Sequence, residues 1–236
     1  MLKERRLEPE WMDDPAIDPG LHAGALAGLE RINRFSANAA VLWPPIRELA
    51  RRHPQRPLKI LDIATGAGDL PVRLWKMGRR AGLAVEMDGC DRSETALEYA
   101  RRNAAKAGAS VRFFPLDPFV SGIPSGYDLL LCSKFFHHLD NEQAGELLRL
   151  MAGAARRRIV VNDLLRSVPG LALAFGGTRL LTRSPVVHKD ASLSVRAAFT
   201  LPEVRSMAQQ ARLEHCRVSR SWPVRFLLVW DKPRDA

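Results

Sequence analysis

The sequence predicts an α/β fold in which most strands are parallel and helices cover both faces of the sheet. Two observations lead to this expectation. From residue 58 onward, short and nearly continuous apolar runs alternate with helical patterns, as in buried parallel sheets. The 236 residues, 46% of them hydrophobic, are enough for one sizeable core and cramped for two independent domains.

The apolar periodicity and the turn residues place the elements in order. Two helices come first, at 22–36 and 44–53, the second with proline at its start. The expected strands are 58–63, 83–90, 111–114, 127–133, 158–163, 216–222 and 225–230, and the later helices are 69–80, 93–107, 141–155, 171–181 and 202–211. The sheet would thus have seven strands and end in an antiparallel hairpin turned at Pro223.

This order suggests two parts. Residues 1–56 would form an N-terminal helical extension, able to act as a lid, and residues 57–236 the main domain. No apolar run approaches the roughly 20 residues needed to span a membrane. The N-terminus also lacks the apolar core of a secretory signal. We therefore expect a protein of the cytoplasm, as a monomer or homodimer.

Charge and cysteine content narrow the possible partners. The net charge is +10, which could favour nucleic acid or an anionic surface. The basic residues are scattered, however, and many fall near predicted helix ends, where cations suit the helix dipole. We expect a solvated basic surface without a specific nucleic-acid site. The three widely spaced cysteines, Cys90, Cys132 and Cys216, form neither a disulfide framework nor a zinc motif, so no metal is expected.

A glycine-rich turn follows the first strand of the main domain. Gly66-x-Gly68 ends a strand and opens a helix, where glycine permits a tight turn and close approach of a ligand. Asp69 stands near the position where a dinucleotide site would place a third glycine. Asp62 would repel a pyrophosphate, but it suits the cationic amino-acid end of S-adenosylmethionine (SAM).

Two further carboxylates follow the next strands. Asp91 ends the second strand, where it can accept hydrogen bonds from both ribose hydroxyls. Asp117 follows the third strand, where it can accept from an adenine amino group. Three carboxylates at successive strand ends favour SAM. The predicted cofactor residues are Asp62, Ala64, Thr65, Gly66, Gly68, Asp91, Arg92, Asp117, Pro118 and Ser133. The alternative is that Asp91 and Asp117 only cap turns and helices.

On these residues, 58–163 resembles the class I SAM-dependent methyltransferases, in particular the small-molecule branch with the quinone-biosynthesis enzymes. The resemblance implies a Rossmann-like sheet, SAM as cofactor, and binding roles for the glycine-rich turn, Asp91 and Asp117. The stretches 162–167 and 183–190 are similar to methyltransferases found beside type III polyketide synthases. The acceptor would then be a small, partly apolar phenol, enol or quinol, methylated on oxygen or carbon.

A base for such an acceptor is sought after the fourth and fifth strands. His137 and His138 follow the fourth strand, and either could take a proton because histidine titrates near neutral pH. Beyond the fifth strand, an apolar helix precedes His188, the favoured base, with Asp190 or Asp163 as its orienting partner. Phe135, Phe136, Leu173 and Phe175 would line the apolar part of the pocket.

Other readings stay open. An RNA methyltransferase is one, although the segment after the fourth strand lacks the (D/N)PP(Y/F) motif of amino-methylating enzymes. A SAM-binding partner protein without catalysis is another. A dehydrogenase is disfavoured by the missing third glycine and by the absence of a Tyr-x-x-x-Lys pair.

Overall fold

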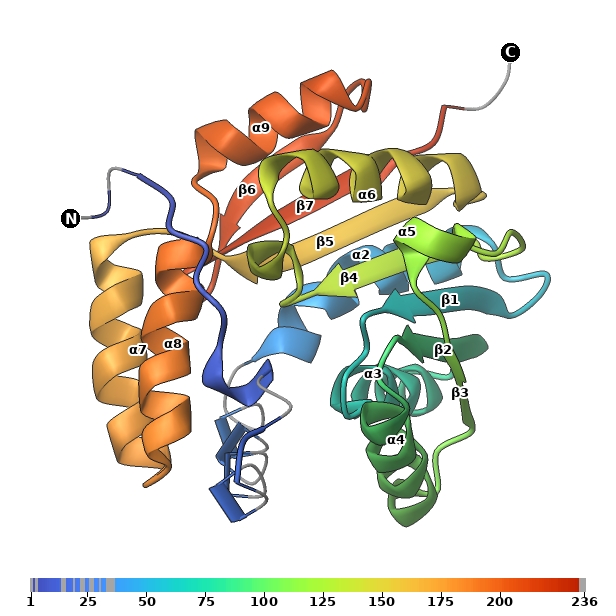
Figure 1. Cartoon of the computed structure of the whole chain (residues 1–236). Helices are drawn as coiled ribbons and strands as arrows, with labels where there is room; N and C mark the ends of the chain where they lie inside the picture. Colours follow the sequence, from blue (N-terminus) through green and yellow to red (C-terminus); the bar gives the residue numbers. More distant parts are fainter. Residues whose placement is uncertain are drawn as a thin grey trace.

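The computed structural model describes residues 2, 4–13, 16–18, 20–21, 24–25, 28–29, 31–32 and 37–233. Seven strands form one sheet in the order β3-β2-β1-β4-β5-β7-β6. The strands are β1 (Leu58–Ile63), β2 (Val85–Asp91), β3 (Val111–Pro115), β4 (Leu129–Ser133), β5 (Arg158–Leu164), β6 (Arg217–Ser221) and β7 (Arg225–Asp231). Strands β1 to β5 are parallel, and β7 runs antiparallel to both β5 and β6 (Figure 1). The predicted Rossmann-like sheet with a terminal hairpin is confirmed.

Helices cover both faces of this sheet. The α-helices are α2 (Asn38–Arg52), α3 (Asp69–Arg80), α4 (Glu94–Ala107), α5 (Pro118–Ser121), α6 (Asn141–Ala154), α7 (Val168–Leu181), α8 (Pro185–Ala197) and α9 (Leu201–Gln210), with 3-10 turns η1 (Trp11–Asp13) and η2 (Phe136–His138). One core cluster joins α2 and α3 to the sheet, and another joins α6 and α9 to the opposite face. Both faces are therefore apolar, which explains the continuous hydrophobic runs of the strands.

The helix expected at 44–53 begins earlier than predicted. α2 starts at Asn38 and contains Pro44 and Pro45. Proline usually opens a helix because it cannot donate to the preceding turn. Here Leu42 and Ile46, on either side of the prolines, are fully buried against the sheet, and that packing outweighs the lost hydrogen bond. The carbonyl of Pro45 accepts a hydrogen bond from the buried Arg158. The predicted helix 22–36 lies mostly outside the described residues.

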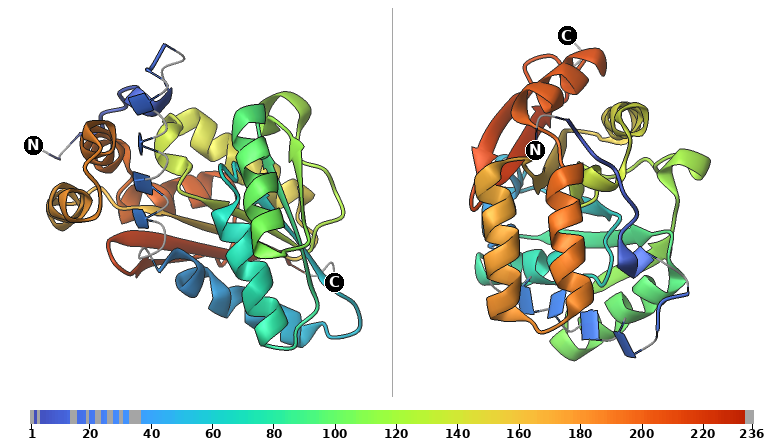
Figure 2. Two further views of the ribbon diagram at one scale, coloured as in Figure 1. Left: turned by 90° about the horizontal axis from the view of Figure 1, so that it is seen from below. Right: turned by 60° about the vertical axis from the view of Figure 1, so that its left-hand side comes forward.

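Helix α8 was not predicted from the sequence. Its start carries a helix signal, because the Ser184 hydroxyl accepts from the Val187 amide and Pro185 occupies the first turn. α7 and α8 lie side by side beyond the carboxyl end of β5 (Figures 1 and 2). α8 is the inner helix of the pair, because it also packs against η1 and η2. None of the described helices is long and apolar enough to cross a bilayer.

Residues 4–12 form an N-terminal arm that crosses the carboxyl edge of the sheet (Figure 1). Arg5 donates to the carbonyls of His137, Leu139 and Ala197, at 3.1, 2.5 and 2.5 Å. Its guanidinium also lies 3.8 Å from the centre of the Phe199 ring. The arm thereby ties the η2 turn to the end of α8. Its predicted action as a lid stays a prediction.

Candidate active site

The turn after β1, residues 64–68, is called the cradle below. It is open beside Gly66 and tightly packed behind Gly68. Gly66 and Gly68 have φ angles of +54° and +74°, which favour glycine. A Cβ on Gly68 would lie 2.7 Å from the Ala100 side chain and 2.8 Å from the Phe113 ring, so packing requires glycine there. A Cβ on Gly66 would meet nothing within 4 Å. Space beside the Gly66 backbone is what a closely bound ligand needs.

Asp62 and Thr65 form a buried pair under this cradle. The Asp62 side chain is almost fully buried, and its Oδ2 accepts a 2.7 Å hydrogen bond from the Thr65 hydroxyl. Burial raises the pKa of Asp62 to about 7, although the hydrogen bond from Thr65 opposes the shift. A cationic group placed beside Asp62 would favour its ionised form. The pair therefore suits a ligand with an ammonium group.

Asp91 connects the cradle to the end of β2. Its Oδ2 accepts from the Gly66 amide at 2.8 Å, and its Oδ1 accepts from the Ser93 amide at 2.9 Å. Each carboxylate oxygen can accept a second bond, so a diol could bind to both. Asp117, after β3, caps α5 by accepting from the Phe119 amide at 2.9 Å. The capping role considered for Asp117 is thus observed, and its contact with adenine stays a proposal.

The remaining predicted cofactor residues have different surroundings. Ala64 belongs to the cradle with a φ of +54°, and Pro118 opens α5 beside Asp117. Arg92 is exposed, and its charge contributes to lowering the pKa of His138. Ser133 is buried and exchanges hydrogen bonds with Asn38 of α2 at 2.9 and 3.3 Å. The observed partner of the Ser133 hydroxyl is therefore within the protein.

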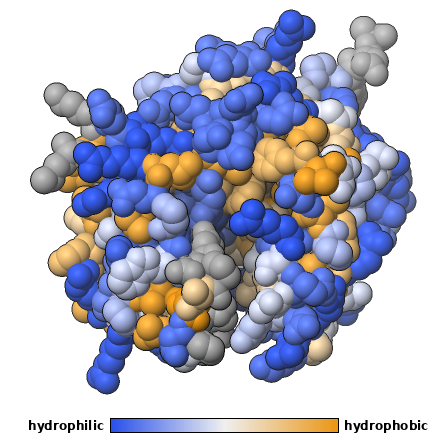
Figure 3. Space-filling model, viewed as in Figure 1, coloured by the Kyte–Doolittle hydropathy of each residue, from blue (hydrophilic) through white to orange (hydrophobic). Residues whose placement is uncertain are grey.

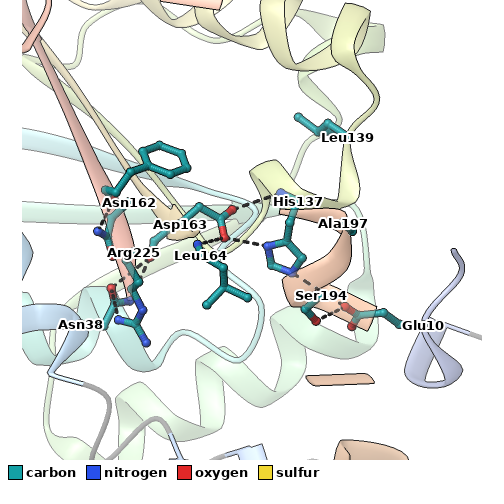
Figure 4. Close-up of polar contacts among 12 residues, drawn as sticks. Glu10, Asn38, His137, Leu139, Asn162, Asp163, Leu164, Ser194, Ala197 and Arg225 are labelled. Atoms are coloured by element: carbon teal, nitrogen blue, oxygen red, sulfur yellow. Dashed lines mark hydrogen bonds and ion pairs between the residues drawn. The ribbon is translucent and has the colours of Figure 1, made fainter. Parts of the chain in front are cut away.

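His137 and Asp163 form a buried pair at the carboxyl ends of β4 and β5 (Figure 4). His137 Nδ1 lies 2.7 Å from Asp163 Oδ1, and the His137 amide donates to Oδ2 at 3.2 Å. Burial lowers the pKa of His137, but the carboxylates of Asp163 and Glu10 outweigh it, and the net shift is upward. Burial acts to raise the pKa of Asp163, yet His137 and the Leu164 amide bring it below its usual value.

The other ring nitrogen of His137 faces Glu10 of the N-terminal arm. His137 Nε2 lies 3.8 Å from Glu10 Oε1, which also accepts the Ser194 hydroxyl of α8. His138 is a further neighbour of His137, with the two ring centres 4.3 Å apart. Burial and the neighbouring His137 lower the pKa of His138 to about 3, so it is neutral at physiological pH. The arrangement leaves His137 as the titrating member.

Glu10, His137 and His138 each offer one possible metal-ligand atom, a carboxylate oxygen or a ring nitrogen. These atoms lie within 4.8 Å of one another. Ligand atoms bound about 2.0–2.2 Å from one ion lie roughly 3–3.5 Å apart. The Glu10 to His137 distance of 3.8 Å exceeds this, and Glu10 is already bonded to Ser194. We therefore interpret these three side chains as a hydrogen-bonding cluster around His137. The expectation that the protein holds no metal stays a prediction.

His188, the favoured base, lacks the partners expected for it. Its Nε2 lies 2.8 Å from the Thr182 carbonyl at the tip of the α7–α8 hairpin. Asp163 pairs with His137 instead. Asp190 accepts from the amides of Trp11 and Met12, at 2.9 and 3.0 Å, and so holds the N-terminal arm. The expected orienting pairs are wrong, because Asp190 and Asp163 have closer partners that the sequence does not place nearby.

The predicted apolar lining also needs correction. Phe136 is fully buried, edge-on to Phe199 and Phe226, and belongs to the core. Leu173 and Phe175 are 47% and 56% exposed on α7, the outer helix of the pair. Phe135 stays near the site, stacked on His138 with ring centres 6.2 Å apart.

The sequence analysis did not find three residues of this region. Glu10 and Arg5 belong to an acidic and proline-rich segment without a local motif, and only the fold brings them to η2. Lys134 follows β4 with a left-handed φ of +57°. Burial and Arg225 lower the pKa of Lys134 to about 8. The sequence did contain a signal for Lys134. It is a charged residue directly after a parallel strand, and ligands bind at the carboxyl ends of such strands.

A hollow of about 600 Å³ lies at the opposite edge of the sheet, lined by Lys59, Glu86 and Asp88 among others. Asp88 there accepts from Arg112 and from the Tyr127 hydroxyl, at 2.5 and 2.6 Å. These charges are satisfied by one another, so the cradle and the His137–Asp163 pair remain the candidate active site.

Comparisons with known proteins match this chain to methyltransferases. Residues 60–157 match a family model described as a methyltransferase domain. A demethylmenaquinone methyltransferase of Thermus thermophilus is 36% identical over 42% of this chain and 45% of its own length. The match thus spans less than half of that relative. A ubiquinone biosynthesis O-methyltransferase of Bordetella pertussis is 29% identical over 78% of this chain and 79% of its own.

Among solved structures, the plantazolicin methyltransferase BamL, in complex with a triazolic desmethylPZN analog and SAH, superposes with a TM-score of 0.71. The alignment covers 92% of both chains at 14% identity, so it supports the fold alone.

Proposed function

We propose that this chain, a class I SAM-dependent methyltransferase, methylates an acidic hydroxyl of a small, partly apolar molecule. The acceptor class we infer is a phenol, enol or quinol. The observation that carries this proposal is the buried His137–Asp163 pair at the carboxyl ends of β4 and β5. A hydroxyl of this kind must lose a proton when it is methylated, and His137 is placed to accept it.

The cradle fits SAM by shape and by charge. The open space beside Gly66 leaves room for a ligand against the backbone. Asp91 would accept the two ribose hydroxyls, Asp117 the adenine amino group, and Asp62 would face the ammonium end. Bound SAM supplies a methyl group on a positively charged sulfur, so the protein need only align the acceptor and remove its proton.

Asp163 determines which ring nitrogen of His137 carries the proton before the reaction. Its carboxylate accepts the Nδ1–H of His137, which leaves the Nε2 lone pair as the proton acceptor. When Nε2 takes the hydroxyl proton, the new positive charge lies between Asp163 and Glu10. The acceptor oxygen would then form its bond to the methyl carbon with its own electron pair, while the bond from that carbon to sulfur breaks and its electrons stay on the sulfur, which leaves as a neutral thioether. Asp163 thus orients the ring and stabilises the imidazolium, as in other oriented-base sites.

The N-terminal arm completes the site. Arg5 holds the turn that carries His137 through the carbonyls of His137 and Leu139. Glu10 extends from the same arm toward Nε2 and is fixed by Ser194 (Figure 4). A closed arm would exclude water from the proton-transfer step, which supports the predicted lid. Removal of residues 1–12 should therefore reduce turnover more than SAM affinity.

Specific RNA methylation is a weaker candidate. A cysteine nucleophile for base methylation would need an accessible thiolate. Cys132 is fully buried, and burial raises its pKa well above the usual value, so it offers none. Cys90 is likewise fully buried, with its pKa raised by burial to about 12.

An acceptor screen tests the proposal. The purified protein would be incubated with isotopically methyl-labelled SAM and a panel of alkylated phenols, pyrones and quinols, with product identification by mass spectrometry and NMR. We expect label on the oxygen, or on the adjacent ring carbon, of an acidic hydroxyl compound. Transfer only to amines or thiols, with no hydroxyl compound methylated, would refute the proposal.

A further inference from the structure

α7 exposes an apolar face that the site does not use. Val168, Leu173, Phe175 and Leu180 are 72%, 47%, 56% and 87% exposed, and Ala172 between them is exposed as well. At 100° per residue, the exposed positions cover about 160° of the helix circumference. Arg179 is the one charged residue of the helix. A helix exposed to water normally carries polar side chains on its outer face, so this surface is unusual.

The charged residues of the segment that carries this face are all of one sign. The sequence from Leu164 to Lys189 contains no aspartate or glutamate. Arg179, Arg183 and Lys189 are exposed. The Arg179 guanidinium lies 3.5 Å from the centre of the Phe175 ring, so its charge lies over an aromatic ring within the apolar face. In the space-filling view, orange side chains appear on the side of α7 and α8 within a largely blue surface (Figure 3).

A large aromatic side chain belongs to the loop beside the start of α7. Trp222 is 74% exposed in the β6–β7 turn. The same turn is tied to α7, because the Val224 carbonyl accepts from the Leu165 amide at 3.1 Å. A Cβ on Gly170 would lie 3.3 Å from the Val224 side chain. Tryptophan is typical of the level at which lipid headgroups meet acyl chains.

From these observations we propose that the exposed face of α7 docks onto an anionic lipid bilayer, lying parallel to its surface. Val168, Leu173, Phe175 and Leu180 would enter the headgroup–acyl boundary, and Arg179 and Arg183 would pair with lipid phosphates. An apolar face with a basic border is the composition of such interfacial helices. The 14 residues of α7 give about 21 Å of contact along the surface.

A second copy of the chain fits this face less well than lipid does. A two-fold contact places the same surface of both copies together. Arg179 and Arg183 of each copy would then approach those of the other, and the segment 164–189 has no carboxylate to pair with them. Anionic lipid supplies the missing negative charge. The docking does not depend on the proposed function, because α8 lies between α7 and His137.

Co-sedimentation with vesicles tests the docking. The full chain would be mixed with phosphatidylcholine vesicles, with and without phosphatidylglycerol, at low and moderate salt. We expect binding to the phosphatidylglycerol vesicles. The variant Phe175→Ser/Leu180→Ser should bind them at least about tenfold more weakly, because two inserted apolar side chains are lost. Both side chains are exposed, so its thermal midpoint should stay near that of the wild type.

Val120→Ser is the matched control. Val120 of α5 is 82% exposed, but it lies outside α7, so its loss should leave binding unchanged. Equal binding by the double variant and the wild type would mean that the basic surface alone attracts the vesicles, and would overturn the docking by α7. Light scattering would reveal the other overturning result, a dimer that the double variant dissociates and that binds no vesicles.

Discussion

Replacing Asp163 with asparagine removes the charge that orients His137 while keeping the size of the side chain. The carboxylate accepts three hydrogen bonds, from His137 Nδ1, the His137 amide and the Leu164 amide, at 2.7, 3.2 and 2.6 Å. An asparagine amide can donate to Nδ1 and so favour the tautomer of His137 that carries its proton on Nε2. That tautomer has no lone pair on Nε2 to accept the proton of the hydroxyl. We expect turnover to fall roughly 10²–10⁴-fold. At about 1.4 kcal/mol per tenfold, this is a barrier higher by roughly 3–6 kcal/mol.

The pH dependence separates this role from a merely structural one. In the wild type, the rate should rise with pH through a value above the usual histidine pKa of about 6.5, because the base must be neutral and its pKa is raised. Asp163→Asn removes the strongest of the influences that raise the pKa of His137 and leaves the lowering effect of burial. The pKa of His137 should then fall, and the rise in rate should move to lower pH. The variant should thus be slower and yet reach its plateau at lower pH.

Asp128→Asn is the matched control for this measurement. Asp128 is also nearly fully buried, but it pairs with Arg56 and Arg157 at the amino end of β4. Its replacement should lower the thermal midpoint without moving the pH profile. Turnover would be followed at saturating SAM, with SAM affinity measured by calorimetry. If Asp163→Asn has the same pH profile as the wild type, the assignment of His137 as the base is refuted.

Four further results are expected. Asp91→Ala should weaken SAM binding by roughly 1–3 kcal/mol in calorimetry, since bonds to a charged group are lost, and tight NAD binding without SAM binding would contradict the cradle assignment. His188→Ala should retain near wild-type turnover because His188 bonds to a backbone carbonyl, and a hundredfold loss would return it to the base role. Arg5→Ala should lower turnover but not SAM affinity, because it frees the carbonyls of His137 and Leu139, whereas unchanged turnover would show the arm to be dispensable. Total RNA and DNA should take up no stoichiometric tritium label from methyl-labelled SAM, and site-specific labelling would overturn the small-molecule assignment.

The sheet and the glycine-rich turn after β1 could be predicted because their signals are local. The apolar runs set the strands, and the turn from Asp62 to Gly68 combines a strand end with glycines that the backbone requires. Asp91 follows from the same rule, since the carboxyl ends of parallel strands share one edge of the sheet.

The catalytic region was harder to predict because it depends on contacts between distant segments. Glu10 reaches His137 only through the N-terminal arm, and the arm is fixed by Asp190 of a helix that the sequence analysis missed. His188 has an acidic neighbour in sequence, Asp190, but that carboxylate binds the arm. Proximity along the chain therefore suggested the wrong partner for His188.

The most direct test of the account is a structure of the protein with SAH and a methyl acceptor identified by the screen. We expect the acceptor hydroxyl oxygen within about 2.6–3.2 Å of His137 Nε2, with the Nδ1 side still bonded to Asp163. We also expect the ribose hydroxyls against Asp91. An acceptor oxygen bound at His188, with His137 out of reach, would contradict the account.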